Sequence, residues 1–125
     1  MSSSADSQAQ TIAELTCRIQ EFASARDWAQ FHNSKNLTMS LASETGELAA
    51  IFRWIDGRDS DASVAAGPRR DQLEAEIGDI GICLLLLCAR VDVDLGSAVT
   101  RKLAANAIKY PIETSRGRAD PPEPI

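Results

Sequence analysis

The sequence predicts an all-α fold, and three observations carry this prediction. Apolar side chains recur at alternating spacings of three and four residues along several segments, which is the period of one face of an α-helix. No segment alternates apolar and polar residues convincingly enough to indicate a β-strand. Capping residues and prolines divide the chain into four such segments. We therefore expect a protomer of four helices.

The first helix is expected from Thr11 to about Asp27. Thr11 and Glu14 have the spacing of a capping box, in which each side chain bonds the backbone near the other. The polar and aromatic connection that follows leads to a second helix, for which Asn36 is the expected N-cap. The second helix is expected to end near Gly57.

The segment from residue 57 to residue 68 consists largely of small and polar residues and ends in a proline, so it is predicted to be a mobile loop. A third helix is expected from about Arg69 to Arg90. The fourth is expected from Leu95 to about Lys109, with Asp94 as its cap and Pro111 as its stop.

These elements predict one helical domain over residues 11–112. Residues 1–10 are polar and small, which indicates a disordered tail, and residues 113–125 form a second polar tail rich in proline. The first residues have no apolar core, so they resemble neither a secretory signal nor a transit peptide. A cytoplasmic protein is therefore expected.

Charge and composition exclude several classes of partner. The net charge of -5 and the scattered basic residues argue against a surface for nucleic acid or for an anionic membrane. The longest apolar run, residues 80–89, is too short to cross a bilayer. The three cysteines form no metal-type pair and are expected to be buried, reduced thiols: Cys17, Cys83 and Cys88.

Carboxylates interrupt the apolar stripe of the second helix. Glu44 occupies a position in this stripe where an apolar residue is expected, and Glu47 lies one turn further on, at the edge of the same face. Burial of an ionised carboxylate costs several kcal/mol or more unless it is paired or binds a metal. The other members of the stripe are apolar: Leu37, Leu41, Leu48, Ile51 and Ile55.

The third helix repeats this feature. Glu76 lies in a stripe with Leu73 and Ile80, and Asp79 follows one turn later. If the two helices pack through their stripes, four carboxylates meet: Glu44, Glu47, Glu76 and Asp79. No lysine or arginine lies on either stripe, so divalent cations would have to offset the repulsion.

The ligand type favours Mg²⁺, with Mn²⁺ as a possible substitute, because these ions take oxygen ligands. Zinc prefers histidine or cysteine, and a di-iron bundle needs a Glu-x-x-His pair, whereas the single histidine, His32, is not at that spacing. Mg²⁺ is typically completed by substrate phosphates, which points to a nucleoside polyphosphate. The alternative is that each pair of carboxylates is a solvated or salt-bridged face.

Three segments together resemble the all-α MazG-like nucleotide pyrophosphohydrolases, in the branch that contains dCTP pyrophosphatases. They are "RDWAQFHNSKNLTMSLASETGELAAIFRW", "LEAEIGDIGICLLLL" and "RKLAANAIKYP", and the resemblance covers roughly residues 12–118. It implies hydrolysis between the α and β phosphates, which releases a nucleoside monophosphate and pyrophosphate. It also implies that the four carboxylates bind Mg²⁺ and that the chain works as a homodimer or homotetramer.

The fourth helix offers cationic and polar groups along one side. In a metal-phosphate site Lys102, and Lys109 beside it, would neutralise phosphate oxygens, while Asn106 and Tyr110 would hydrogen-bond sugar or phosphate. The alternative is a solvated helix face whose last lysine favours the helix dipole.

Two tryptophans, Trp28 and Trp54, lie where similar proteins enclose the base. A flat apolar slot suits a pyrimidine, because stacking is favourable on any π-face; core packing is the alternative. His32 and Asn36 lie in the same base-binding segment.

The expected function is house-cleaning hydrolysis of a nucleoside triphosphate, a pyrimidine such as dCTP or a modified analogue. Glu47 is the expected carboxylate that orients or deprotonates the water, and Lys102 assists. Many relatives carry a glutamate where this chain has Ala75, and Glu74 lies about 100° away around the helix. A catalytically weak nucleotide-binding or helical interaction protein therefore remains an alternative.

Apolar residues surround the third helix over Ile80, Ile82 and residues 84–87. This is more than one face of a small protomer can bury, so it predicts a subunit interface.

Overall fold

The computed structural model describes residues 10–119 and confirms the all-α class, because no strand occurs in this range. The chain divides into two compact units, of which the first ends at Asp92 and the second begins at Val93. The single domain over residues 11–112 stays a prediction.

In the first unit, α2 (Ile12–Ala25) begins as predicted. The hydroxyl of Thr11 accepts a hydrogen bond from the backbone N–H of Glu14 at 3.1 Å. The helix ends where Asp27 adopts a left-handed conformation, with φ 56°, and the N–H of Trp28 donates to the carbonyl of Ala23. Aspartate tolerates this conformation better than most residues. The turn leads the chain into a short 3₁₀ helix, η1 (Ala29–Phe31).

The next helix, α3 (Ser34–Phe52), starts three residues earlier than predicted and ends at Phe52 rather than near Gly57. Asn33, not Asn36, is the N-cap: its backbone is extended and its side-chain oxygen accepts from the N–H of Asn36 at 2.9 Å. The two asparagines have the same capping chemistry, and the backbone after η1 decides between them. Asn36 instead donates its side-chain amide to the carbonyl of Phe31.

The predicted mobile loop over residues 57–68 contains a helix, α4 (Gly57–Ser63), so that prediction is wrong. The hydroxyls of Ser60 and Ser63 donate to backbone carbonyls within the segment. Val64, directly after the helix, is only 8% exposed. Burial of this valine thus stabilises a segment whose composition otherwise indicates a loop.

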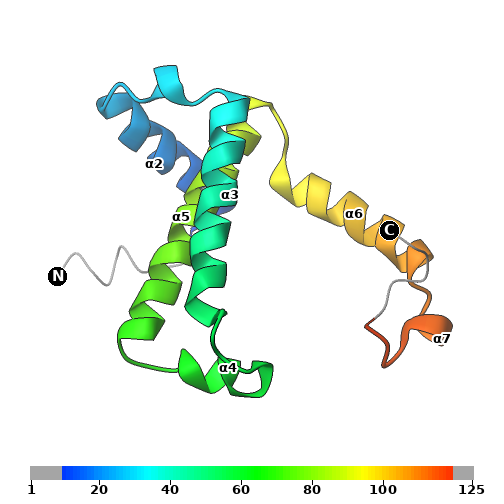
Figure 1. Ribbon diagram of the computed structural model, residues 1–125. Coiled ribbons are helices and arrows are strands. Elements are labelled where there is room, and N and C mark those ends of the chain that lie inside the picture. The colour runs from blue at the N-terminus through cyan, green and yellow to red at the C-terminus, as the bar shows by residue number, and fades with distance from the viewer. Residues whose placement is uncertain (1–9, 120–125) are drawn as a thin grey trace. The chain divides into compact units, whose positions relative to one another are not determined.

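The longest helix, α5 (Pro68–Arg90), has proline in its first turn, where the missing N–H costs no hydrogen bond. Figure 1 shows α3 and α5 side by side and antiparallel, and they form the most extensive helix pair of the structure. Helix α2 also packs on α5. Leu37 of α3 and Leu85 of α5 are buried. The carboxylate-bearing stripes of α3 and α5 therefore belong to helices that pack together.

The second unit contains α6 (Leu95–Lys109), with the predicted bounds. Asp94 caps it by accepting a hydrogen bond from the N–H of Ser97 at 2.9 Å, which lowers the pKa of Asp94 below its ordinary value of 3.8. A further short helix, α7 (Ile112–Ser115), begins after Pro111. It lies partly in the predicted polar tail.

The four-helix count is wrong for the described range, which holds six α-helices and η1. The two additional helices, α4 and α7, are too short to show a helical apolar period. Residues 1–9, most of the predicted N-terminal tail, and residues 120–125 lie outside the described residues.

Large apolar side chains remain exposed on both units. Trp54 is 88% exposed and Ile108 is 82% exposed, whereas among described residues the buried apolar side chains are Ala23, Leu37, Val64 and Leu85. No described helix is both long and apolar enough to cross a membrane. All three cysteines are unpaired, as expected, but Cys17 is exposed rather than buried, and Cys83 and Cys88 are half-buried.

Candidate functional site

Three carboxylates from two helices meet at the contact between α3 and α5. Glu44 and Glu47 come from α3 and Glu76 comes from α5, and one oxygen of each lies within 4.8 Å of the other two. Glu44 and Glu76 are half-buried, while Glu47 is exposed. We call these three residues the carboxylate cluster. The structure thus brings together three of the four predicted metal ligands.

The electrostatics of the carboxylate cluster are those of a site that lacks positive charge. The side chain of Glu44, burial, and then Glu47 raise the pKa of Glu76 from 4.5 to about 7. One oxygen each of Glu44 and Glu76 is buried without a hydrogen-bond partner among the described residues. The ion pairs of the same range, Arg58 with Asp56 and Arg70 with Glu74, do not involve the cluster.

A divalent cation fits this arrangement. Three carboxylates offer the all-oxygen ligands that Mg²⁺ and Mn²⁺ prefer, and an ion would satisfy the two buried oxygens. Its charge would also relieve the repulsion that raises the pKa of Glu76.

The fourth predicted ligand, Asp79, lies one turn beyond Glu76 on α5 and is exposed. It does not belong to the group of three whose oxygens approach one another. Glu74, on the same helix, forms an ion pair with Arg70 at 2.9 Å. Ala75 is exposed beside Glu76. Neither position 74 nor position 75 therefore adds a carboxylate to the cluster.

A cavity of about 390 Å³ lies between α2, η1, α3 and α5, and its lining is mostly apolar. Three predicted substrate-binding residues line it: Trp28, His32 and Asn36. Phe22 and Phe31 also line it. We call this cavity the aromatic pocket. Its rings provide the flat surfaces on which a nucleobase can stack.

A stack of side chains at the end of α2 sets the position of Trp28. The guanidinium of Arg26 lies 3.6 Å from the centre of the Phe22 ring and donates to the carbonyl of Phe22 at 3.0 Å. The Phe22 ring meets Trp28 edge to face, with centres 5.8 Å apart. These contacts hold one wall of the aromatic pocket in place.

Cys83 links the aromatic pocket to the carboxylate cluster. It lines the pocket, and its pKa is raised by burial and then by the charges of Glu44 and Asp79. Ser40, one turn before Glu44 on α3, lines the pocket from the facing helix. A ligand in the aromatic pocket would therefore lie beside the carboxylate cluster.

The other predicted substrate-binding residues belong to other segments of the chain. Trp54 follows the end of α3 and is highly exposed, with the guanidinium of Arg53 5.5 Å from its ring centre. The remaining four belong to the second unit, where Lys109 lies 5.5 Å from the ring of Tyr110: Lys102, Asn106, Lys109 and Tyr110. Asn106 is half-buried, while the two lysines are exposed.

Sequence reasoning missed several residues of the aromatic pocket. Phe22 and Phe31 were not among the expected site residues, and Cys83 was expected only as a buried thiol. The aromatic residues of the connection after α2 were the available signal, because two of them lie within four residues of His32.

The known proteins to which this chain is similar are pyrophosphatases. No protein-family model matches the chain. Over 109 residues, 87% of this chain, it is 38% identical to dCTP pyrophosphatase 1 of Mus musculus, and over 106 residues it is 37% identical to dCTP pyrophosphatase 1 of Homo sapiens. The chain spans 64% and 62% of the length of these two relatives.

A solved structure is similar in both fold and sequence. The crystal structure of a pyrophosphatase from Archaeoglobus fulgidus superposes with a TM-score of 0.76 at 33% identity. The match covers 83% of this chain and 95% of the archaeal one.

Proposed function

Because the chain belongs to the MazG-like all-α pyrophosphatase family, in the branch of the dCTP pyrophosphatases, we propose that it hydrolyses a nucleoside triphosphate to the monophosphate and pyrophosphate. The observation that carries this proposal is the carboxylate cluster beside an aromatic pocket. One can hold a metal and phosphates, and the other can hold a base.

We propose Mg²⁺ as the metal, with Mn²⁺ as a substitute. Glu44, Glu47 and Glu76 would hold it, and Asp79 would join them through a different side-chain conformation or through water. Mg²⁺ bound there supplies Lewis-acid stabilisation of phosphate charge. Among the three, Glu47 is the one exposed to solvent, so it is our candidate for orienting or deprotonating the attacking water.

The aromatic pocket is our candidate for the base site. Trp28, held by Phe22 and Arg26, would stack on the base, and His32 would contact its edge. Asn36 donates one amide N–H to the carbonyl of Phe31, so its oxygen and its second amide N–H are left for a ligand. A cavity of about 390 Å³ suits a pyrimidine, and we propose dCTP or a modified analogue as the substrate.

The second unit would supply the remaining groups. Lys102 would neutralise phosphate charge and assist catalysis, Lys109 would add to it, and Asn106 and Tyr110 would hydrogen-bond sugar or phosphate. Trp54 would close over a base. These roles rest on the residue types and on the resemblance of their segments to the family.

We further propose that the chain works as a homodimer or homotetramer. The exposed apolar side chains support this, because a chain with so few buried ones gains stability by association. Trp54, Ile108 and Ile112 are the most exposed of them.

One observation favours a weaker second candidate, a nucleotide-binding protein with little catalysis. Ala75 stands where many relatives carry a glutamate. The carboxylate of the preceding residue, Glu74, forms an ion pair with Arg70. In this case the nucleotide would bind without hydrolysis.

Hydrolysis in ¹⁸O-labelled water tests the reaction itself. Attack at the α-phosphate places the label in the monophosphate, and mass spectrometry of the two products detects it there. Label in pyrophosphate would indicate attack at the β-phosphate and would contradict the proposed reaction. Binding of dCTP without any product would favour the second candidate.

A further inference from the structure

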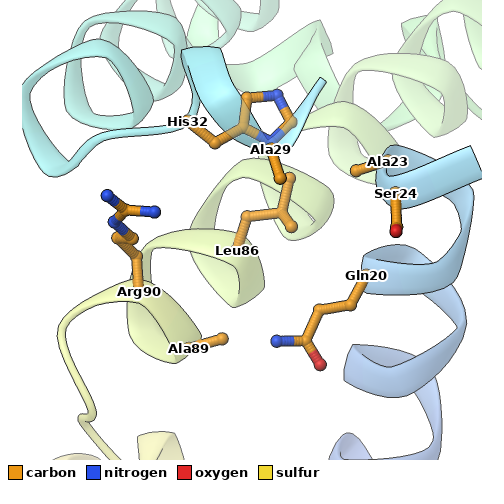
Figure 2. Close-up of a pocket in the computed structure, with 8 residues that line it drawn as sticks. All are labelled: Gln20, Ala23, Ser24, Ala29, His32, Leu86, Ala89 and Arg90. Carbon is orange, nitrogen blue, oxygen red and sulfur yellow. The ribbon is translucent and has the colours of Figure 1, made fainter. Parts of the chain in front are cut away.

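A second cavity, of about 470 Å³, lies between α2, η1 and the end of α5 (Figure 2). Its polar lining consists of Gln20, Ser24, His32 and Arg90, and Leu86 lies among them. Figure 2 shows the side chains of Arg90, His32 and Gln20 arranged around this space. We call this cavity the Arg90 compartment.

The Arg90 compartment contains donors that the protein leaves without partners. Within residues 10–119, the side chains of Gln20, His32 and Arg90 form no hydrogen bond or ion pair with another residue. No carboxylate lines the cavity. The arginine alone offers five N–H donors in a planar fork, which matches the two oxygens of a carboxylate or phosphate.

Backbone carbonyls do not occupy these donors. The carbonyls of Ala23 and Ser24, at the end of α2, accept bonds from the turn that follows, and the carbonyl of Leu87 accepts from Val91. The negative ends of the two helices are therefore partly satisfied by the backbone. The free donors of the compartment face solvent or a ligand.

The Arg90 compartment continues the aromatic pocket. The two cavities share Ala23, His32 and Leu86 in their linings. Along α5, Glu76 belongs to the carboxylate cluster, Cys83 to the aromatic pocket and Arg90 to the compartment. At about 1.5 Å per residue, Arg90 lies roughly 21 Å beyond Glu76 along the helix axis. The compartment therefore lies on the side of the aromatic pocket away from the carboxylate cluster.

We propose that the Arg90 compartment binds a small oxyanion, a carboxylate or a phosphate, through the guanidinium of Arg90 with His32 and Gln20 as further donors. Two sources can supply this group. One is a free anion in solution. The other is a carboxylate carried on the far edge of a nucleobase in the aromatic pocket, and this source rests on the proposed function.

His32 allows a local measurement, because it is the single histidine of the chain. We would follow its imidazole NMR signals in metal-free protein during titration with inorganic phosphate, and separately with dCMP and 5-carboxy-dCMP. None of these measurements depends on hydrolysis. Arg90→Gln removes the charge, Arg90→Lys keeps the charge without the planar fork, and Arg69→Gln, at the other end of α5, is the matched control.

If the compartment binds a free anion, inorganic phosphate should shift the His32 signals, and Arg90→Gln should weaken this binding about tenfold or more. If the compartment binds a carboxylate on the nucleobase, 5-carboxy-dCMP should bind more tightly than dCMP, and Arg90→Gln should abolish this difference in affinity. Arg90→Lys should lie between, and Arg69→Gln should bind as the native chain. The proposal is overturned if phosphate does not bind and 5-carboxy-dCMP binds no more tightly than dCMP. It is also overturned if Arg90→Gln and Arg69→Gln bind these probes with the same affinity.

Discussion

Glu44 of α3 and Glu76 of α5 face each other with carboxylate oxygens within 4.8 Å, and each retains one buried oxygen without a partner among the described residues. Two helices that pack through apolar stripes thus bring like charges into contact. The cost of this arrangement is visible in the raised pKa of Glu76, and a divalent cation would remove it.

The first prediction concerns pH and the metal-free protein. Because the pKa of Glu76 is about 7 in the folded chain and near 4.5 in the unfolded one, the folded state binds more protons between these values. The free energy of unfolding should therefore fall as pH rises from 4.5 through 7. Denaturation in EDTA at pH 5 and pH 8 measures this.

Glu76→Gln should remove this part of the pH dependence and should stabilise the metal-free protein at pH 8. Added Mg²⁺ should stabilise the native chain most above pH 7, where the proton no longer competes for the site. A metal-free native chain that is more stable at pH 8 than at pH 5, with Glu76→Gln unchanged from it, would contradict the assigned cluster.

The second prediction concerns catalysis by the carboxylates. Glu47→Gln should lower the rate of pyrophosphate release roughly a hundredfold or more, because the variant loses a metal ligand and our candidate base. Asp79→Asn should lower it less, since this residue lies outside the group of three. Steady-state kinetics with saturating Mg²⁺ measures both.

Glu74→Gln is the matched control for these variants. It makes the same chemical change on α5, but its carboxylate is paired with Arg70 rather than with the cluster. We expect near-native turnover. Equal losses in Glu74→Gln and Glu47→Gln would mean that general charge, and not the cluster, determines the rate.

The third prediction concerns the start of α3. Asn33→Ala removes the side-chain oxygen that accepts from the N–H of Asn36, and should cost about 1 kcal/mol of unfolding free energy. Chemical denaturation measures the loss. Ser34→Ala, at the next position, removes a hydroxyl that makes no capping bond and should have a smaller effect. A larger loss in Ser34→Ala would place the cap elsewhere.

The fourth prediction concerns association through the second unit. Leu103 is 64% exposed on α6, and Leu103→Asp should shift the protein to a smaller mass in sedimentation velocity at micromolar concentration. Ala104→Asp, at the adjacent and also exposed position, should leave the mass unchanged or shift it less. A native chain that is strictly monomeric would refute the predicted assembly.

Much of the fold can be predicted from the sequence, because the long helices combine a helical spacing of apolar residues with recognisable capping residues. The bounds of α6 and the cap of α2 are as predicted, since the side chains of Asp94 and Thr11 each accept a hydrogen bond from the first turn of the helix that follows. Short elements carry no such period. Helix α4 depends on one buried residue, Val64, and the cap of α3 depends on a choice between two asparagines that have the same chemistry.

The sequence also predicts part of the candidate site, namely the carboxylate cluster. Glu44 and Glu76 stand out because each interrupts an apolar stripe, and their helices pack as the stripes predict. The Arg90 compartment is not predictable in this way, because Gln20, His32 and Arg90 lie far apart in the sequence and line the same cavity only in the folded chain. Spacing along one helix says nothing about such a meeting.

Hydrolysis at the carboxylate cluster is tested most directly by pyrophosphate release from a panel of nucleoside triphosphates, with Mg²⁺ and with EDTA, for the native chain, Glu47→Gln and Glu74→Gln. We predict release that requires Mg²⁺, favours deoxypyrimidine triphosphates, persists in Glu74→Gln and is lost in Glu47→Gln. Release that continues in EDTA or in Glu47→Gln would contradict it. Binding without release from any nucleotide would do so too, and would make Ala75→Glu the first variant to examine.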